Sequence, residues 1–118
     1  MLKTHKITVT TTGGAGVATG TATSDNPIIG ELVGIYLDYV SQPGTCDVTV
    51  ATAGTPSTTI LTVTNGNTDG WFYPRHGVVN ASNSAITDSN APFIIADKIT
   101  VSIAQGDAAS LIAYIQVQ

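Results

Sequence analysis

The sequence predicts an all-β protein: a single-domain antiparallel β-sandwich, jelly-roll-like in arrangement, with eight or nine short strands. Composition is the first observation, because Thr (19), Ile (12) and Val (11) together supply 42 of the 118 residues. These β-branched side chains lose rotamer freedom in a helix and pack well on a pleated sheet. The second observation is that apolar and polar residues alternate in short segments separated by turn-forming residues. No stretch has helical periodicity, so residues 1–118 are expected to form one β-sandwich domain.

The N-terminal part of the chain contains two expected strands. Residues 5–12 alternate Ile7 and Val9 against threonines, which predicts a strand with one buried face. Gly13, Gly14 and Gly16 end this strand. The segment 17–23 then resumes as a thin, threonine-rich strand, which we expect at a sheet edge.

The clearest strand is expected over residues 31–40. Two tyrosines, several β-branched residues and a central glycine make a helix unfavourable there. A period of two places Val33, Ile35, Leu37 and Tyr39 on one face, and Leu32, Tyr36 and Val40 on the other.

The rest of the chain reads as further short strands and turns. A polar, small-residue surface loop is expected at 80–91, and residues 76–79 are a candidate extension of the preceding aromatic strand. The remaining expected strands cover 46–51, 59–64, 71–75, 93–95, 98–104 and 111–118.

Several of these strands are apolar on both faces. In the strand expected at 31–40, Leu32, Tyr36 and Val40 give the second face apolar side chains. In the strand expected at 111–118, Ile112 and Tyr114 do the same. A small monomer does not normally expose so many such side chains in one patch. The sequence therefore predicts burial of these side chains against another subunit.

Charge and cysteine content exclude several functional classes. The net charge of −4 would repel a phosphate backbone, so no nucleic-acid partner is expected. No apolar run approaches the roughly 18 residues of a membrane span, and the N-terminus lacks the apolar segment of a signal peptide, so neither a membrane nor secretion is expected. Cys46 is the only cysteine and cannot form an intrachain disulfide. We expect it to be a half-buried strand residue.

No pattern of catalytic or metal-binding residues stands out. The loop Asn65–Gly70 resembles the start of a calcium loop, but Asp69 is its only carboxylate and position 12 is His76 rather than a glutamate. Neither His5 nor His76 has a base or acid partner at a diagnostic spacing. The sequence predicts a protein that is not an enzyme and has no cofactor and no metal.

The densest cluster of large side chains is Trp71, Tyr73 and Arg75. Aromatic residues and arginine dominate protein interfaces, and an aromatic ring also stacks on a sugar ring. The alternative is that Trp71 and Tyr73 fill the core. Residues 1–6 are a candidate extended arm, in which Leu2, Lys3 and Lys6 would contact a neighbouring subunit.

A resemblance to a known group of proteins begins at Asn67–Arg75. This run, the small polar loop after it, the strand 97–104 and the segment Leu32–Tyr39 resemble small β-rich structural proteins of tailed bacteriophages, encoded near head genes. The resemblance implies a capsid decoration (cement) protein that binds the major capsid protein and stabilises the head. It further implies that the chain associates with itself as a homotrimer or homodimer. It also implies a place on the virion surface after synthesis in the host cytoplasm. The alternatives are a carbohydrate- or receptor-binding module of a tail or fibre, and a tail-tube or baseplate component.

Overall fold

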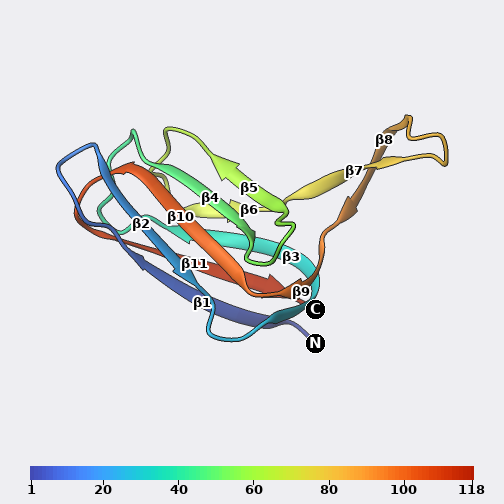
Figure 1. Cartoon of the computed structure of the whole chain (residues 1–118), viewed down its shortest axis with the longest axis horizontal. Helices are drawn as coiled ribbons and strands as arrows, with labels where there is room; N and C mark the ends of the chain where they lie inside the picture. The colour runs from blue at the N-terminus through green and yellow to red at the C-terminus, as the bar shows by residue number, and fades with distance from the viewer.

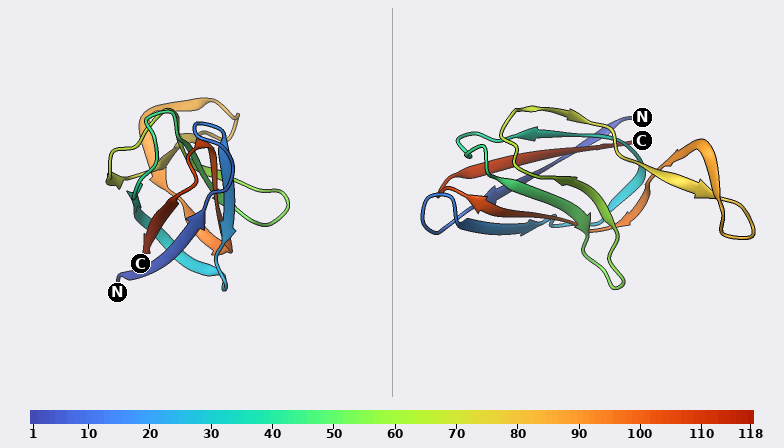
Figure 2. Two further views of the ribbon diagram at one scale, coloured as in Figure 1. Left: turned by 90° about the vertical axis from the view of Figure 1, so that its left-hand side faces the viewer. Right: turned by 90° about the horizontal axis from the view of Figure 1, so that it is seen from above.

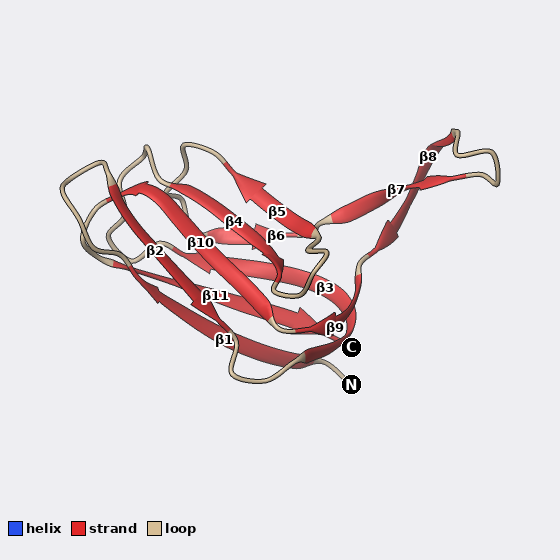
Figure 3. Ribbon diagram, viewed as in Figure 1, coloured by secondary structure: helices blue, strands red, loops and turns tan.

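Eleven β-strands and no helix make up the fold in the computed structural model, which describes all 118 residues (Figure 1, Figure 3). The strands are β1 Lys3–Thr10, β2 Ala18–Thr23, β3 Ile28–Asp38, β4 Asp47–Thr52, β5 Thr59–Val63, β6 Gly70–Phe72, β7 Arg75–Val79, β8 Ala85–Pro92, β9 Ile94–Asp97, β10 Ile99–Gly106 and β11 Ser110–Val117. The all-β prediction is confirmed. The strand count is higher than expected because β7 and β8 form a hairpin of their own.

Two antiparallel sheets form the sandwich. Sheet I has the order β1-β11-β3-β6, with β9 pairing the start of β3, and sheet II has the order β2-β10-β4-β5. The pairs β1 with β11, β2 with β10, β3 with β6 and β4 with β5 are those of a long hairpin rolled into two sheets. This is the wrapping of a jelly roll, so the predicted architecture is confirmed.

The core lies between the inward faces of the two sheets. Its 19 buried residues form one cluster, to which sheet I contributes Ile35 and Leu37 and sheet II contributes Val50 and Val101. All four are fully buried. Burying a Val, Leu or Ile side chain contributes about 1.5–3 kcal/mol. The alternating apolar residues seen in the sequence therefore supply the main driving force for sandwich formation.

The inward face of β3 shifts at Val33. Opposite it, β11 pairs Gln116 with Gly34 but Val117 with Leu32, which leaves Val33 as an extra residue. A bulge of this kind shifts the alternation of side chains by one position. Leu32 is consequently buried at 1% exposure, and the prediction that it shares the outer face with Tyr36 is wrong.

A buried polar network closes the end of the sandwich where the β1–β2 and β10–β11 connections lie. Gln42 Nε2 donates to Thr11 Oγ1 over 3.0 Å, and Gln42 Oε1 accepts from the Asp107 backbone N–H over 3.0 Å. Thr11 Oγ1 also accepts from the backbone N–H of Ala109 at 3.1 Å. These bonds satisfy polar groups that would otherwise be costly to bury, and they join three loops.

The β7–β8 hairpin projects from the opposite end of the sandwich (Figure 2). It makes the molecule elongated, with extents of 48 × 28 × 27 Å. The prediction of a loop over residues 80–91 is wrong for most of that segment, since β8 begins at Ala85. The small polar residues of this segment show no alternation of apolar and polar side chains, so the sequence did not predict a strand. The strand forms because β8 pairs with β7.

The expected N-terminal arm is also mostly strand. Lys3 pairs with Val117 and Lys6 with Tyr114, so β1 already forms the edge of sheet I from residue 3. Only Met1 and Leu2 precede it. The prediction of an arm over residues 1–6 is wrong because the backbone of these residues is hydrogen-bonded into a ladder with β11.

A candidate aromatic binding face

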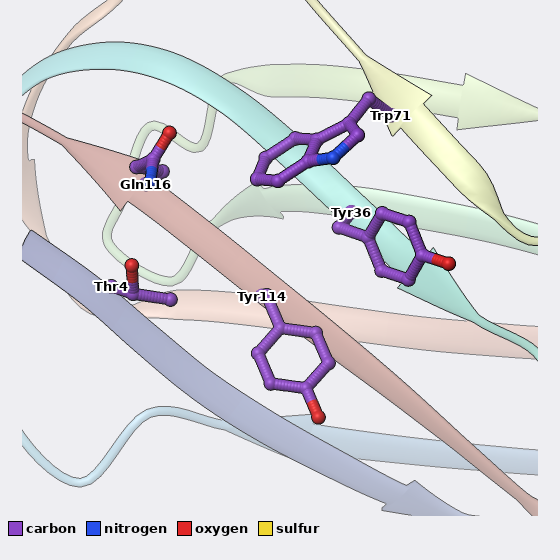
Figure 4. A pocket seen from close by; sticks show the side chains of 5 residues that line it. All are labelled: Thr4, Tyr36, Trp71, Tyr114 and Gln116. Carbon is purple, nitrogen blue, oxygen red and sulfur yellow. The ribbon is translucent and has the colours of Figure 1, made fainter.

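The outer face of sheet I carries a row of aromatic side chains that crosses three neighbouring strands. The ladder places Tyr36 of β3 directly opposite Tyr114 of β11 on one side and Trp71 of β6 on the other. Lys6 of β1 pairs with Tyr114 and extends the row to the sheet edge. Figure 4 shows the three rings on the same side of the sheet.

The row points outward because its neighbours point inward. Ile35 and Leu37 flank Tyr36 and are fully buried, and Ala113 and Ile115 flank Tyr114 in the same way. On β6, Phe72 packs against the core, which leaves Trp71 45% exposed. The alternative in which Trp71 and Tyr73 fill the core is therefore excluded, since Tyr73 is 61% exposed.

Tyr36 contacts the rings on both sides of it. The Tyr36 and Trp71 rings meet edge to face, with centroids 5.4 Å apart and an interplanar angle of 65°. The Tyr36 and Tyr114 rings are tilted by 58°, with centroids 6.2 Å apart. An edge-to-face pair contributes about 0.5–1.5 kcal/mol beyond the area that it buries. Tyr36 is thus the central ring of the row.

Tyr73 extends the aromatic surface because residue 34 is a glycine. A Cβ atom on Gly34 would lie 3.0 Å from Tyr73 Cδ1 and 3.1 Å from Cε1, so the ring lies over the glycine backbone. The Trp71 and Tyr73 rings are nearly parallel, with centroids 6.1 Å apart and an angle of 12°. Sequence reasoning missed the role of Gly34, because nothing local to it shows that a residue 39 positions later will cover it.

A shallow hollow of about 340 Å³ lies along this row. Tyr36, Trp71 and Tyr114 supply its aromatic surface, while Thr4 and Gln116 supply polar groups (Figure 4). Thr4 and Gln116 are themselves paired across β1 and β11. They lie two residues along these strands from the Lys6–Tyr114 pair of the aromatic row. None of the five lining residues is charged. We refer to these five residues together with Tyr73 as the aromatic binding face.

The structure separates the six predicted contact residues into two groups. Trp71 and Tyr73 belong to the aromatic binding face, and Lys6 adjoins it through Tyr114. The other three residues are not part of it. Leu2 precedes β1 and Lys3 is the first residue of β1. Arg75 is the first residue of β7, and its Nη1 donates to the Pro74 carbonyl. Tyr36 and Tyr114 were noticed only as surplus apolar residues, although the row depends on them.

The loop Asn65–Gly70 is occupied by structural hydrogen bonds. Asp69 Oδ1 accepts from the Tyr39 backbone N–H at 2.8 Å, and Asn67 Nδ2 donates to the Gln42 carbonyl at 3.3 Å. No group of three or more His, Cys, Asp or Glu side chains is gathered anywhere in the chain. The arrangement therefore provides no cage of anionic oxygens for a calcium ion.

Two buried titratable groups lie near that loop. Burial, reinforced by the negative charges of Cys46 and Asp69, raises the pKa of Tyr39 to about 12. The Tyr39 hydroxyl is buried without a hydrogen-bond partner. Burial and the nearby Asp47 carboxylate also raise the pKa of the Cys46 thiol. Cys46 is fully buried rather than half-buried, and a protonated, inaccessible thiol is a poor nucleophile.

The comparisons with known proteins give structural similarity only. Neither a protein-family model nor a curated protein matches the chain. Two similar solved structures are variants of a family 29 carbohydrate-binding module, with TM-scores of 0.41 and 0.43 and identities of 10% and 9%; each alignment covers 99% of this chain and 81% of the other. A third variant, solved with cellulohexaose, has a TM-score of 0.39 and 9% identity over 98% of this chain and 79% of its own. No helix in the structure is long and apolar enough to cross a membrane.

Proposed function

We propose that this protein is a non-catalytic carbohydrate-binding module that holds a neutral glycan on the outer face of sheet I. The observation that carries the proposal is the outward-facing row Tyr114–Tyr36–Trp71, with the polar groups of Thr4 and Gln116 beside it. A sugar ring presents a face of C–H groups, which suits the electron-rich face of an aromatic ring. Its hydroxyl groups need a few hydrogen-bond partners at the edge of that contact.

The absence of charge in the hollow supports a neutral ligand. Its five lining residues have aromatic, hydroxyl or amide side chains, and these supply donors and acceptors without a fixed charge. Lys6 is at the far end of the row, beyond Tyr114, rather than among the rings. A glycan made of unmodified hexoses matches this composition better than a phosphorylated or sulfated ligand does.

The shape of the face supports a chain rather than a single sugar. The three rings lie on three neighbouring strands, and strands in a sheet are about 4.7–4.9 Å apart. The row therefore runs across the strands on one side of the sheet (Figure 4). A linear oligosaccharide lying across β11, β3 and β6 would contact all three rings, whereas a monosaccharide would contact only one or two.

The test is a glycan array followed by calorimetry on the strongest binder. We expect Trp71→Ala and Tyr36→Ala each to weaken binding at least about tenfold, which corresponds to about 1.4 kcal/mol. Val17→Ala is the matched control, because Val17 is 70% exposed and lies in the β1–β2 connection, outside the aromatic binding face. An array without any bound glycan, or binding that survives both aromatic substitutions, would contradict the proposal.

A second candidate function is that of a virion structural protein that decorates the capsid. The specific observation that favours it is the elongated shape, since a hairpin projecting from a compact sandwich is suited to reach a neighbouring protein. In this candidate Trp71, Tyr73 and Arg75 would contact the major capsid protein, with Leu2, Lys3 and Lys6 at the edge of the contact. Co-sedimentation with capsids stripped of accessory proteins tests it. Capsid binding that is lost in Trp71→Ala, together with a blank glycan array, would favour this candidate over the first.

A further inference from the structure

Two further grooves follow the free edge of β1, beside the aromatic hollow. Their volumes are about 280 and 210 Å³. The larger groove is lined by Thr4, His5, Lys6, Ser24, Asp25 and Asn26. The smaller one shares Lys6, Ser24 and Asp25 with it and continues to Thr8 and Thr23. We call the two grooves together the edge groove.

The edge groove adjoins the aromatic hollow, because Thr4 lines both. Thr4 belongs to β1, the edge strand of sheet I, and the row of rings ends on the same strand at Lys6. The far wall of the groove is the connection between β2 and β3, at residues 24–26 (Figure 1). A chain-like ligand that continues beyond Tyr114 and over β1 therefore enters the edge groove next.

The edge groove is polar where the hollow is aromatic. Lys6 brings one positive charge, Asp25 one negative charge and Asn26 an amide, and all three residues are exposed. An ammonium group donates hydrogen bonds, a carboxylate accepts them, and an amide does both. A sugar hydroxyl can pair with each of these groups, since it is both a donor and an acceptor. The two charges cancel, so the groove suits the same neutral ligand as the hollow.

The turn that forms the far wall is fixed by Ser24. Its backbone N–H donates to the Ile99 carbonyl over 2.9 Å, and its Oγ accepts from the Ile99 backbone N–H over 3.1 Å. The same Oγ donates to the Asn26 carbonyl over 2.9 Å. Ile28, which is fully buried, anchors the other end of the turn. Because the backbone is already held, a ligand does not have to order it on binding.

We propose that the edge groove is a second subsite for the glycan, so that one linear chain of neutral hexoses runs from Trp71 across sheet I, over Thr4 and on to Asp25. The inference rests on the proposed glycan binding and extends it. Four neighbouring strands, β6, β3, β11 and β1, span about 14 Å, and the two sheets of a sandwich lie about 10 Å apart. A trisaccharide on the three rings leaves the edge groove empty, whereas a hexasaccharide reaches it.

The first test is the dependence of affinity on chain length. The probes are the trisaccharide and the hexasaccharide of three neutral series, the cello-, malto- and manno-oligosaccharides, each titrated by calorimetry. A hexasaccharide can place three successive sugars on the rings in about four registers, which alone raises its affinity about fourfold. Contacts in the edge groove should raise the ratio of the two affinities to about twentyfold or more in the series that binds most tightly.

Variants on the two walls of the groove test which residues supply this gain. Asp25→Ala/Asn26→Ala changes the turn, and Lys6→Ala changes β1. Each should weaken hexasaccharide binding about fivefold and leave trisaccharide binding unchanged, so that the ratio falls toward fourfold. Asp88→Asn is the control for loss of a negative charge, because Asp88 is exposed on β8, away from the groove. Trp71→Ala, in contrast, should weaken the binding of both oligosaccharides.

Amide resonances of the nitrogen-15-labelled parent chain give a test that needs no substitution. The N–H signals of residues 24–26 should shift on addition of the hexasaccharide and not of the trisaccharide. Those of Tyr36 and Trp71 should shift with both. This readout separates contact with the groove from an effect of the variants on stability.

Two results would overturn the second subsite and leave the aromatic site in place. One is a hexasaccharide that binds no more than about fourfold more tightly than the trisaccharide. The other is a larger ratio that both groove variants leave unchanged, with no shift at residues 24–26. If no oligosaccharide of any series binds, the proposed function and the second subsite are both wrong.

Discussion

The outer faces of the two sheets occupy equivalent positions in the sandwich and carry opposite kinds of side chain. Across sheet I the ladder aligns Lys6, Tyr114, Tyr36 and Trp71 in one row. Across sheet II the corresponding ladder aligns Thr21, Ser102, Thr49 and Thr62. Both rows cross four strands, and each faces away from the same core. Only one presents large apolar surface to the solvent.

The hydroxyl face shows what this fold needs on an outer surface. Threonine has the branched Cβ that strands favour and a hydroxyl that remains compatible with water. Neighbouring hydroxyls bond across strands, with Thr23 and Thr100 2.9 Å apart and Thr21 and Ser102 3.4 Å apart. Since sheet II is complete without aromatic residues on its outer face, the rings on sheet I are not required by the architecture. These rings are therefore the basis of the proposed glycan binding.

The largest expected effect is on the free energy of unfolding, and it comes from substitutions on the inner faces of the sheets. There the two sheets should respond alike. Ile35 of sheet I and Ile103 of sheet II are both buried, at 0% and 3% exposure. Replacing either by alanine should lower the free energy of unfolding by about 2–5 kcal/mol, because it removes buried methyl groups and leaves a cavity. Urea unfolding followed by circular dichroism measures this. A loss below about 1 kcal/mol at only one of the two sites would show that the sheets do not share a single core.

The next largest effect is on glycan affinity, and it should differ between substitutions on the outer face of sheet I and those on the outer face of sheet II. The double variant Tyr36→Ala/Trp71→Ala is expected to weaken glycan binding by about 100-fold or more, equivalent to about 2.7 kcal/mol, because it removes the central ring and its edge-to-face neighbour. The matched change on sheet II, Thr49→Ala/Ser102→Ala, should leave the affinity unchanged. Calorimetry with the array's strongest ligand distinguishes the two. Equal losses from both variants would mean that binding depends on general stability rather than on the aromatic binding face.

The sequence predicted the parts of this comparison that depend on local alternation. Period-two patterns predicted strands at β1, β3, β10 and β11, because one side of these strands is largely apolar. They also predicted the buried residues Ile7 and Val9 of β1 and Ile35 and Leu37 of β3. The bulge at Val33 was not predictable, since it arises from the register between β3 and β11. The aromatic row was only partly foreseen: Trp71 and Tyr73 were chosen as contacts, but their alignment with Tyr36 and Tyr114 depends on which strands are neighbours. The sequence offered residues 76–79 as a candidate strand, and they lie in β7. It did not predict β8, whose small polar residues carry no periodic signal.

A smaller effect should come from Gly34, which has no counterpart on the hydroxyl face. A Cβ at this position would approach the Tyr73 ring to 3.0 Å and the Phe72 carbonyl to 3.2 Å. Gly34→Ala should therefore displace Tyr73 from its parallel contact with Trp71 and reduce glycan affinity several-fold, about 1 kcal/mol. Tyr73→Ala is the comparison variant. If Gly34→Ala binds as the parent does while Tyr73→Ala binds weakly, the ring tolerates the added methyl and the close approach is not needed.

The smallest effect concerns Tyr39, the one tyrosine of the chain that is turned into the core instead of lying on the outer face. Its hydroxyl is buried without a partner, so Tyr39→Phe should leave stability at pH 7 unchanged or raise it by up to about 1 kcal/mol.

The pKa of Tyr39 is about 12 in the folded protein and about 10 in an unfolded chain. The unfolded state therefore releases the Tyr39 proton first. The contribution of Tyr39 to stability should be fully present below pH 10 and be lost as the pH rises toward 12. Tyr39→Phe should flatten that decline in urea titrations at pH 9, 10 and 11 and leave the decline that comes from Cys46, whose pKa is also raised. A Tyr39→Phe protein that is clearly less stable at pH 7 would indicate that the hydroxyl makes a hydrogen bond after all.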